Sequence, residues 1–153
     1  MNHILNCSWA NLSETLLLLR EGEKLNCETV VLWLGLKSDG NYRVSEVYRP
    51  QQEVDFDFFR IPSTSMRELM GYLRKTRMRI IAQVHSHPAE AFHSRADDKW
   101  AIVRHAGAIS VVVPYFARGI DENTFSAEVA TFQLSTDDSW TSVNSRSVIK
   151  VEP

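Results

Sequence analysis

The sequence is poor in several residue types, and each shortage excludes a structural class. Its 153 residues include only two cysteines, six glycines and five prolines. So little glycine and proline excludes a collagen-like or low-complexity chain. Cys7 and Cys27 are too few for a disulfide framework and form no CxxC pair, so we expect free thiols in a reducing compartment. A single Cys7–Cys27 disulfide remains the alternative.

The chain also lacks a long hydrophobic run and an excess of either charge. Its longest apolar runs, residues 16–19 and 30–34, fall far short of the roughly 18 residues of a membrane span. The first residues lack the basic start and apolar centre of a signal peptide. Lys and Arg number 17 against 19 Asp and Glu, a net charge of −2, which argues against a generic nucleic-acid binder. We therefore expect a cytoplasmic protein that binds neither membrane nor nucleic acid.

What the chain does contain is enough apolar sequence for one core. A chain of this length buries roughly two thirds of its unfolded surface, so residues 1–153 are expected to form a single domain. Hydrophobic periodicity and capping signals predict three helices, at residues 11–22, starting at residue 65, and at residues 94–106. Asn11 would cap the first helix and Gly22 would end it, and a Ser65–Glu68 capping box would begin the second. Strands are predicted at 28–35, 42–48, 56–61, 78–84, 108–113 and 124–134, with an edge strand at 143–151. A turn at residues 38–40 makes a hairpin, and the mixture favours an α/β (α+β) fold with a mixed sheet.

The most informative segment is residues 84–98, where an apolar strand runs directly into two histidines. Residues two apart in extended chain point to the same side, so His85 and His87 can direct two imidazoles at one point. Pro88 ends the strand, and Asp97 follows in the first turn of the next predicted helix. Two imidazole nitrogens and a carboxylate oxygen suit a catalytic zinc ion and leave a position for water.

Each half of this pattern also has an ordinary structural explanation. Ser94 and Asp97 have the spacing of a common helix start, in which the serine caps and the aspartate favours the helix dipole. A His-x-His pair on a strand can face solvent or lie in the core. The two halves together, meeting at one edge of the sheet, are what favour a metal site.

His85-Ser86-His87-Pro88 followed by Ser94-Arg95-Ala96-Asp97 resembles the JAMM motif of MPN-domain (JAB, Mov34/MPN/PAD-1) zinc metalloproteases. Glu28 opens a strand with Gly35 seven residues later, which also resembles that family. The resemblance covers about residues 10–134 and leaves a C-terminal tail at 135–153. It implies an MPN/JAB1 (cytidine deaminase-like) fold, a mixed curved sheet flanked by helices, in a compact prokaryotic deubiquitinase-like member.

The resemblance implies a role for each motif residue. His85, His87 and Asp97 would hold one Zn²⁺ per chain, which lowers the pKa of its bound water. Glu28 would take that water's proton and pass it to the leaving amine, and Ser94 would stabilise the oxyanion. Glu21 and Glu23 are weaker candidates for the base because they precede the strand.

The loop length departs from the common pattern of the family. Five residues separate Pro88 from Ser94, where many members have six. Counting from Pro88 in the commoner spacing would make Asp98 the third ligand. A helix fixes the Ser–Asp geometry more tightly than a loop fixes the Pro–Ser distance, so we prefer Asp97; Asp98 would point about 100° away.

The expected substrate follows from the resemblance too. It implies a metallopeptidase, an isopeptidase that removes a ubiquitin-like protein from a target or processes its precursor. Partners would be that protein or its conjugates, with associated activating and conjugating enzymes, within a bacterial conjugation or antiphage system. The alternatives are a zinc hydrolase that releases a small molecule or amino acid from a sulfur-carrier protein, and a non-catalytic MPN scaffold.

Several other residues carry weaker expectations. His93 lies near the motif. It is either an ordinary loop residue or a residue that contacts a metal ligand or the substrate. The loop at residues 115–125 is either a connector or a substrate contact. Trp33 and Trp100 are expected in the core, His3 and His105 at the surface, and Phe56, Phe58 and Phe59 in a groove or the core.

Overall fold

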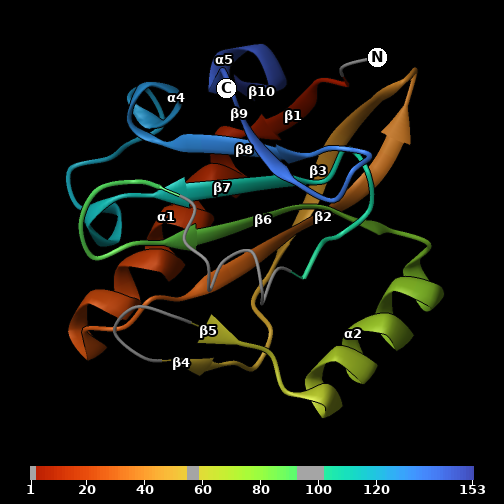
Figure 1. Ribbon diagram of the computed structural model, residues 1–153, viewed down its shortest axis with the longest axis horizontal. Helices are drawn as coiled ribbons and strands as arrows, with labels where there is room; N and C mark the ends of the chain where they lie inside the picture. Colours follow the sequence, from red (N-terminus) through yellow and green to blue (C-terminus); the bar gives the residue numbers. More distant parts are fainter. Residues whose placement is uncertain (1–2, 55–58, 93–101) are drawn as a thin grey trace.

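The computed structural model describes residues 3–54, 59–92 and 102–153 and contains a curled mixed sheet with helices packed on it (Figure 1). The strand order is β10-β1-β3-β2-β6-β7-β8-β9, and β4 and β5 pair separately. The strands are β1 (Leu5–Ser8), β2 (Val30–Ser38), β3 (Asn41–Tyr48), β4 (Glu53–Val54), β5 (Phe59–Arg60), β6 (Arg79–Ser86), β7 (Ile109–Val113), β8 (Ala130–Leu134), β9 (Trp140–Val143) and β10 (Ile149–Glu152). The helical segments are α1 (Trp9–Leu25), α2 (Ser63–Thr76), η1 (Tyr115–Ala117), α4 (Phe125–Glu128) and α5 (Ser145–Val148). The expected mixed α+β fold is confirmed.

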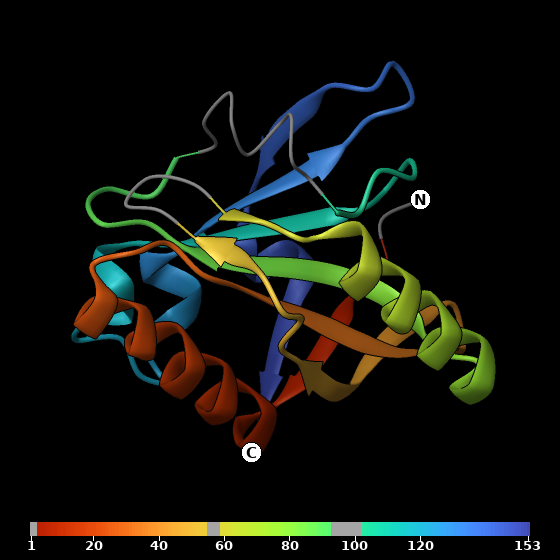
Figure 2. The same ribbon diagram turned by 90° about the horizontal axis from the view of Figure 1, so that it is seen from below.

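Strand β2 is buried on both faces and separates two cores. Val31 and Trp33 pack in the core that includes Leu12, Leu16 and Leu19 of α1. Val30, Leu32 and Leu34 pack in a second core with Leu69 of α2. Successive residues of a strand point to opposite faces, so the two helices cover opposite sides of the sheet, and Figure 2 shows α1 below it.

Helix α1 begins and ends outside the predicted bounds. Its cap is Ser8 instead of Asn11: the Ser8 Oγ accepts the Asn11 N–H at 3.1 Å. Gly22 lies inside the helix, and the left-handed residue after the last turn is Asn26, with φ of 53°. A side chain at Gly22 would place its Cβ 2.5 Å from the Cys27 oxygen, so glycine is required by this close approach of the chain.

Helix α2 also starts earlier than predicted. It follows Pro62, and Ser65 is a buried residue within its first turn, so the predicted capping box does not form. The proline fixes its own φ near the value that precedes a helix, which sets the start without a side-chain cap. Of the predicted strand at 56–61, Phe59–Arg60 is observed as β5, and residues 55–58, which include Phe56 and Phe58, lie outside the described residues.

Two predictions in the second half of the chain are wrong in part. Residues 102–106 are not helical, because the buried Gln83 side chain binds backbone N–H groups that a helix would use: its Oε1 accepts from Ile102 at 2.9 Å and from Val103 at 3.5 Å. The remainder of the predicted helix, 94–101, lies outside the described residues. The predicted strand at 124–134 begins instead with α4, because Asp121 and Thr124 bond each other's backbone N–H groups and start a turn.

The C-terminal residues add two strands to the same sheet. β9 pairs with β8 at one edge, and β10 pairs in parallel with β1 at the other edge. Of the predicted edge strand at 143–151, Val143 ends β9 and residues 149–151 belong to β10, whereas residues 145–148 form α5. Strand β1 was not predicted at all. No helix among the described residues is long and apolar enough to cross a membrane.

Candidate metal centre

Strand β6 places both histidines of the motif at its C-terminal end, in the middle of the sheet. β6 lies between β2, to which it is antiparallel, and β7, to which it is parallel (Figure 1). His85 pairs with Val30 of β2 and with Val112 of β7. His87 continues beyond the strand: its N–H donates to the Val113 oxygen at 2.8 Å. The two rings are 0% and 3% exposed and their centroids lie 5.2 Å apart, which confirms that both point to one side.

Glu28 is held beside the histidines by bonds on both sides of its strand. On one side, Ser86 N–H donates to the Thr29 oxygen at 3.0 Å, and the Ser86 Oγ accepts the Thr29 N–H at 3.1 Å. On the other side, the Gln52 amide acts as a strand partner for Val30: it accepts the Val30 N–H at 2.7 Å and donates to the Val30 oxygen at 3.0 Å. The backbone that carries Glu28 is therefore fixed before β2 begins.

The carboxylate and the two imidazoles form one buried cluster, which we call the Glu28/His85/His87 cluster. One potential ligand atom from each residue lies within 4.8 Å of the others. The closest pair is His87 Nε2 and Glu28 Oε1, at 3.1 Å. Glu28 is 1% exposed. A buried carboxylate is expensive unless it is paired or coordinates a metal, so this grouping is typical of a functional site.

The orientation of His87 fits metal ligation. Its Nδ1 lies 3.3 Å from the Glu90 oxygen, and because a carbonyl only accepts, that nitrogen carries the proton. In the neutral form of that ring the lone pair is on Nε2, the atom turned toward Glu28. Metal-bound histidines in proteins commonly donate their second N–H to a carbonyl in this way. Two adjacent buried imidazole donors, with a buried carboxylate beside them, fit a zinc ion.

Other motif residues and candidates fall outside the described part of the chain. Ser94, Asp97, the alternative Asp98, His93 and Trp100 all lie in residues 93–101. Their expected roles therefore remain predictions. Gln83, which the sequence analysis missed, holds the chain immediately after this stretch: besides Ile102 and Val103, it binds Ser110 of β7 through its Nε2 at 3.0 Å. A buried polar residue two positions before the first histidine was the available signal.

The start of the 115–125 loop is tied to His87. Tyr115, Phe116 and Ala117 all have positive φ, of 53°, 51° and 63°. This strained left-handed turn is held by Phe116 N–H, which donates to the His87 oxygen at 2.9 Å, and by Tyr115 N–H, which donates to the Ala89 oxygen at 3.0 Å. The loop therefore supports the backbone of the site. Its contact with substrate stays a prediction.

The alternative candidates for the base, Glu21 and Glu23, lie outside the Glu28/His85/His87 cluster. Glu21 pairs with Arg49 and Glu23 with Arg118, and neither belongs to the cluster.

Cys7 is a buried free thiol and Cys27 a half-buried one, so the alternative disulfide is not formed. Trp33 is buried as expected, and its Nε1 donates to Thr15 Oγ1 at 2.9 Å. Phe92, 55% exposed, packs edge-on against the His87 ring with centroids 4.7 Å apart.

Comparison with known proteins finds a matching family, a relative and a similar fold. Residues 14–125 match the family described as prokaryotic homologues of the JAB domain. The chain is 34% identical to a probable metalloprotease, y4jG, of Sinorhizobium fredii (strain NBRC 101917 / NGR234) over 122 residues, which cover 77% of this chain and 74% of that protein. Its fold is similar to the solution structure of protein DSY2949 from Desulfitobacterium hafniense, with a TM-score of 0.71, 17% identity, and coverage of 97% and 93% of the two chains.

Proposed function

This chain belongs to the family of prokaryotic homologues of the JAB domain, and we propose that it is a zinc-dependent peptidase that cleaves the amide bond at the C-terminus of a ubiquitin-like protein. Family membership, the similarity to a probable metalloprotease and the Glu28/His85/His87 cluster support the coarser class, a metal-dependent hydrolase. The observation that carries the proposal is the cluster itself, in which a buried carboxylate lies 3.1 Å from one of two adjacent buried imidazoles.

The residues of the cluster divide into metal ligands and a base. His85 and His87 would hold the zinc ion together with Asp97, and Ser94 would donate a hydrogen bond to the developing oxyanion. A zinc ion bound here supplies Lewis acidity, which makes water more acidic and polarises the substrate carbonyl. Glu28 accepts the proton of the attacking water on its carboxylate and delivers it to the leaving amine.

The fold offers a place for the extended tail of the substrate. β6 has both neighbours occupied by β2 and β7, so a tail cannot add a strand to it. The β4–β5 ribbon is separate from the main sheet, and β4 starts one residue after Gln52, which binds the backbone of Val30. We infer that a tail that pairs with this ribbon is directed toward Glu28. The partners would be a ubiquitin-like protein and, in the same pathway, its activating and conjugating enzymes.

Incubation of the protein with ubiquitin-like proteins fused through their C-termini to a reporter tests the proposal. The expected result is cleavage directly after the C-terminal residue of the ubiquitin-like part, lost on chelation and restored by Zn²⁺. The Glu28→Gln variant is the matched control for a contaminating protease. Release of an amino acid from a sulfur-carrier protein, with no cleavage of any fusion, would favour the alternative hydrolase. Full metal loading without either reaction would favour a non-catalytic scaffold.

A further inference from the structure

A cavity of about 380 Å³ lies at the end of the sheet opposite to the Glu28/His85/His87 cluster. Its wall includes Arg79 at the start of β6, whereas the histidines follow at the end of that strand, about 20 Å along the chain by the rise of a strand. Figure 1 shows β6 running across the sheet between β2 and β7. The volume is in the range of small-molecule sites.

The cavity wall divides into an apolar part and a basic part. Leu73 of α2, Ile80 of β6 and Ile102 supply apolar surface, while the basic side chains are Arg79, Arg104, His105 and His3. No aspartate or glutamate is among the described residues that line it. A ligand complementary to this wall carries a negative group and an apolar body.

Arg79 and His105 both line the cavity, and no carboxylate among the described residues of its wall compensates the charge of Arg79. Burial and the charge of Arg79 both lower the pKa of His105, so Arg79 and Arg104 supply the positive charge near neutral pH, and His105 supplies a hydrogen-bonding imidazole. Arg79 makes no ion pair with any described residue. An anion bound here would compensate the charge of Arg79 and gain charge-assisted hydrogen bonds from its guanidinium.

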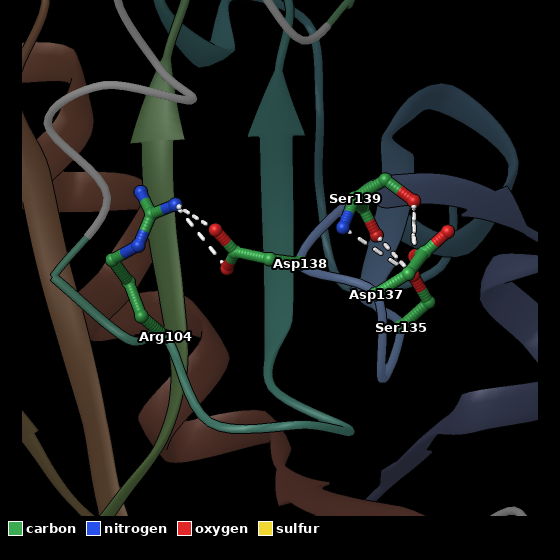
Figure 3. A network of polar contacts seen from close by, with 5 residues as sticks. All are labelled: Arg104, Ser135, Asp137, Asp138 and Ser139. Carbon is green, nitrogen blue, oxygen red and sulfur yellow. Dashed lines mark hydrogen bonds and ion pairs between the residues drawn. The ribbon is translucent and has the colours of Figure 1, made fainter.

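Arg104 already binds a carboxylate, which comes from outside the cavity wall. Its Nη2 lies 3.1 Å and 3.3 Å from the two carboxylate oxygens of Asp138, in the turn between β8 and β9 (Figure 3). The neighbouring Asp137 is engaged instead with Ser135 and Ser139 (Figure 3). The Arg104–Asp138 pair is largely exposed, so it contributes little to stability.

We propose that this cavity binds a small organic anion, with its carboxylate or phosphate group between Arg79, Arg104 and His105 and its apolar body against Leu73, Ile80 and Ile102. The observation that carries the proposal is that exposed basic side chains and half-buried apolar side chains line the same cavity. This second site is independent of the proposed peptidase activity, because none of these residues belongs to the metal cluster.

Calorimetric titration with octanoate and octyl phosphate tests the site, with octylammonium and acetate as probes that lack the charge or the apolar body. Octanoate or octyl phosphate should bind the wild-type protein, and octylammonium and acetate should not. The amide signals of Ile80 and Gly107 should shift in NMR spectra when the anion is added. Binding should be equal with and without chelator, since the metal cluster is at the other end of β6.

Three variants make the test specific. Arg79→Gln should weaken anion binding about tenfold or more, because it removes a charged donor. Arg49→Gln, a change at an arginine that pairs with Glu21 elsewhere, should leave binding unchanged. Asp138→Asn should strengthen binding because it removes a carboxylate that competes with the ligand for Arg104, and asparagine tolerates the positive φ of 63° at this position.

Other outcomes would overturn the assignment. No binding of either anion, equal binding of octylammonium, or wild-type affinity in Arg79→Gln would each exclude an anion site here. All these substitutions are at exposed side chains, and unchanged thermal melting of each variant would show that the fold is intact.

Discussion

At the scale of the residue, the centre of this protein is a carboxylate kept almost fully out of water. Glu28 is 1% exposed, and its Oε1 lies 3.1 Å from His87 Nε2. Its place is set by the backbone bonds that Ser86 and Gln52 make on its two sides. A carboxylate fixed in this way needs little reorganisation to accept a proton, which is the property that a general base requires.

We predict that Glu28→Gln abolishes cleavage and keeps the fold and the metal. Glutamine has nearly the same shape but cannot accept a proton at the same position, so the rate should fall by at least about a hundredfold. Rate measurements on a cleaved fusion, with zinc content determined in parallel, check this. Glu21→Gln should be as active as the wild type, since that side chain is exposed and paired with Arg49. Activity retained in Glu28→Gln would reject Glu28 as the base.

Cys7 and Cys27 should differ strongly in reactivity. Burial raises the pKa of the Cys7 thiol to about 12, so almost no thiolate is present near neutral pH. In native protein a thiol-specific disulfide reagent should modify Cys27 first, and Cys7 should react only when the protein unfolds. Equal rates for the two cysteines in folded protein would contradict the buried environment of Cys7.

The raised pKa of Cys7 also gives stability a direction with pH. The folded pKa is above the ordinary value of 9.0, so the unfolded chain loses its thiol proton first, and this contribution to stability is lost as pH rises from about 9 toward 12. Urea midpoints of Cys7→Ala should fall less over this range than those of the wild type. Cys27→Ala should behave as the wild type.

The sequence predicted the residues of the cluster better than the residues that position them. The strand spacing of His85 and His87, and for Glu28 the family resemblance, placed these three residues in one site, and the structure brings them together. Ser86, Gln52 and Gln83 were not predicted, because a polar side chain that binds backbone groups has no required spacing in sequence. Their partners are 22 to 57 residues away along the chain for Gln52 and Ser86.

At the scale of the element, predictions held where burial on a face dictated the pattern. β2, β3, β6 and β7 were predicted from apolar and β-branched residues, and they are the strands nearest the site. The element boundaries that were predicted wrongly are set by contacts that the local sequence pattern does not reveal. Helix α1 begins at Trp9, so Ser8 is the cap, and Asn11 lies in the first turn, where its Nδ2 donates to the Val44 oxygen at 3.1 Å. β1 is short, and its parallel pairing with β3 and β10 gives no local signal.

Gln83 gives a prediction about how two elements are joined. Gln83→Leu should leave the N–H groups of Ile102 and Val103 without their acceptor, at a cost of about 1–3 kcal/mol. Urea denaturation measures that loss, and faster hydrogen exchange at Ile102 would localise it. Ile102 follows Asp97 by five residues, so we also expect weaker zinc binding.

Ser110→Ala is the matched control for this substitution. It removes the partner of the Gln83 Nε2 but keeps the acceptor of the Ile102 N–H. Zinc affinity close to that of the wild type in Ser110→Ala, with a clear loss in Gln83→Leu, would support a positioning role. Equal zinc affinities in both variants would show that Gln83 serves stability alone.

At the scale of the whole molecule, the sheet brings together segments that are far apart in the chain. The Glu28 segment and the end of β6 come from strands separated by about fifty residues, and they meet only because β2 and β6 pair in antiparallel register. The main core lies beneath this pairing, since Val31, Ala82 and Val84 pack on α1. A ligand that binds residues on β6 at this point therefore stabilises the folded sheet as a unit.

We predict that zinc raises the melting temperature of the whole domain through His85 and His87. A ligand at a hundred times its Kd stabilises the folded state by about 2.7 kcal/mol, which corresponds to about 5–10 °C for a domain of this size. Calorimetric melting of chelated and zinc-loaded protein measures the shift. In His85→Ala combined with His87→Ala the shift should vanish, whereas His105→Ala, at the other end of the sheet, should retain it. Circular dichroism of the double variant verifies that it is folded before zinc is added. A folded double variant that still gains the full shift would show that the metal is held elsewhere.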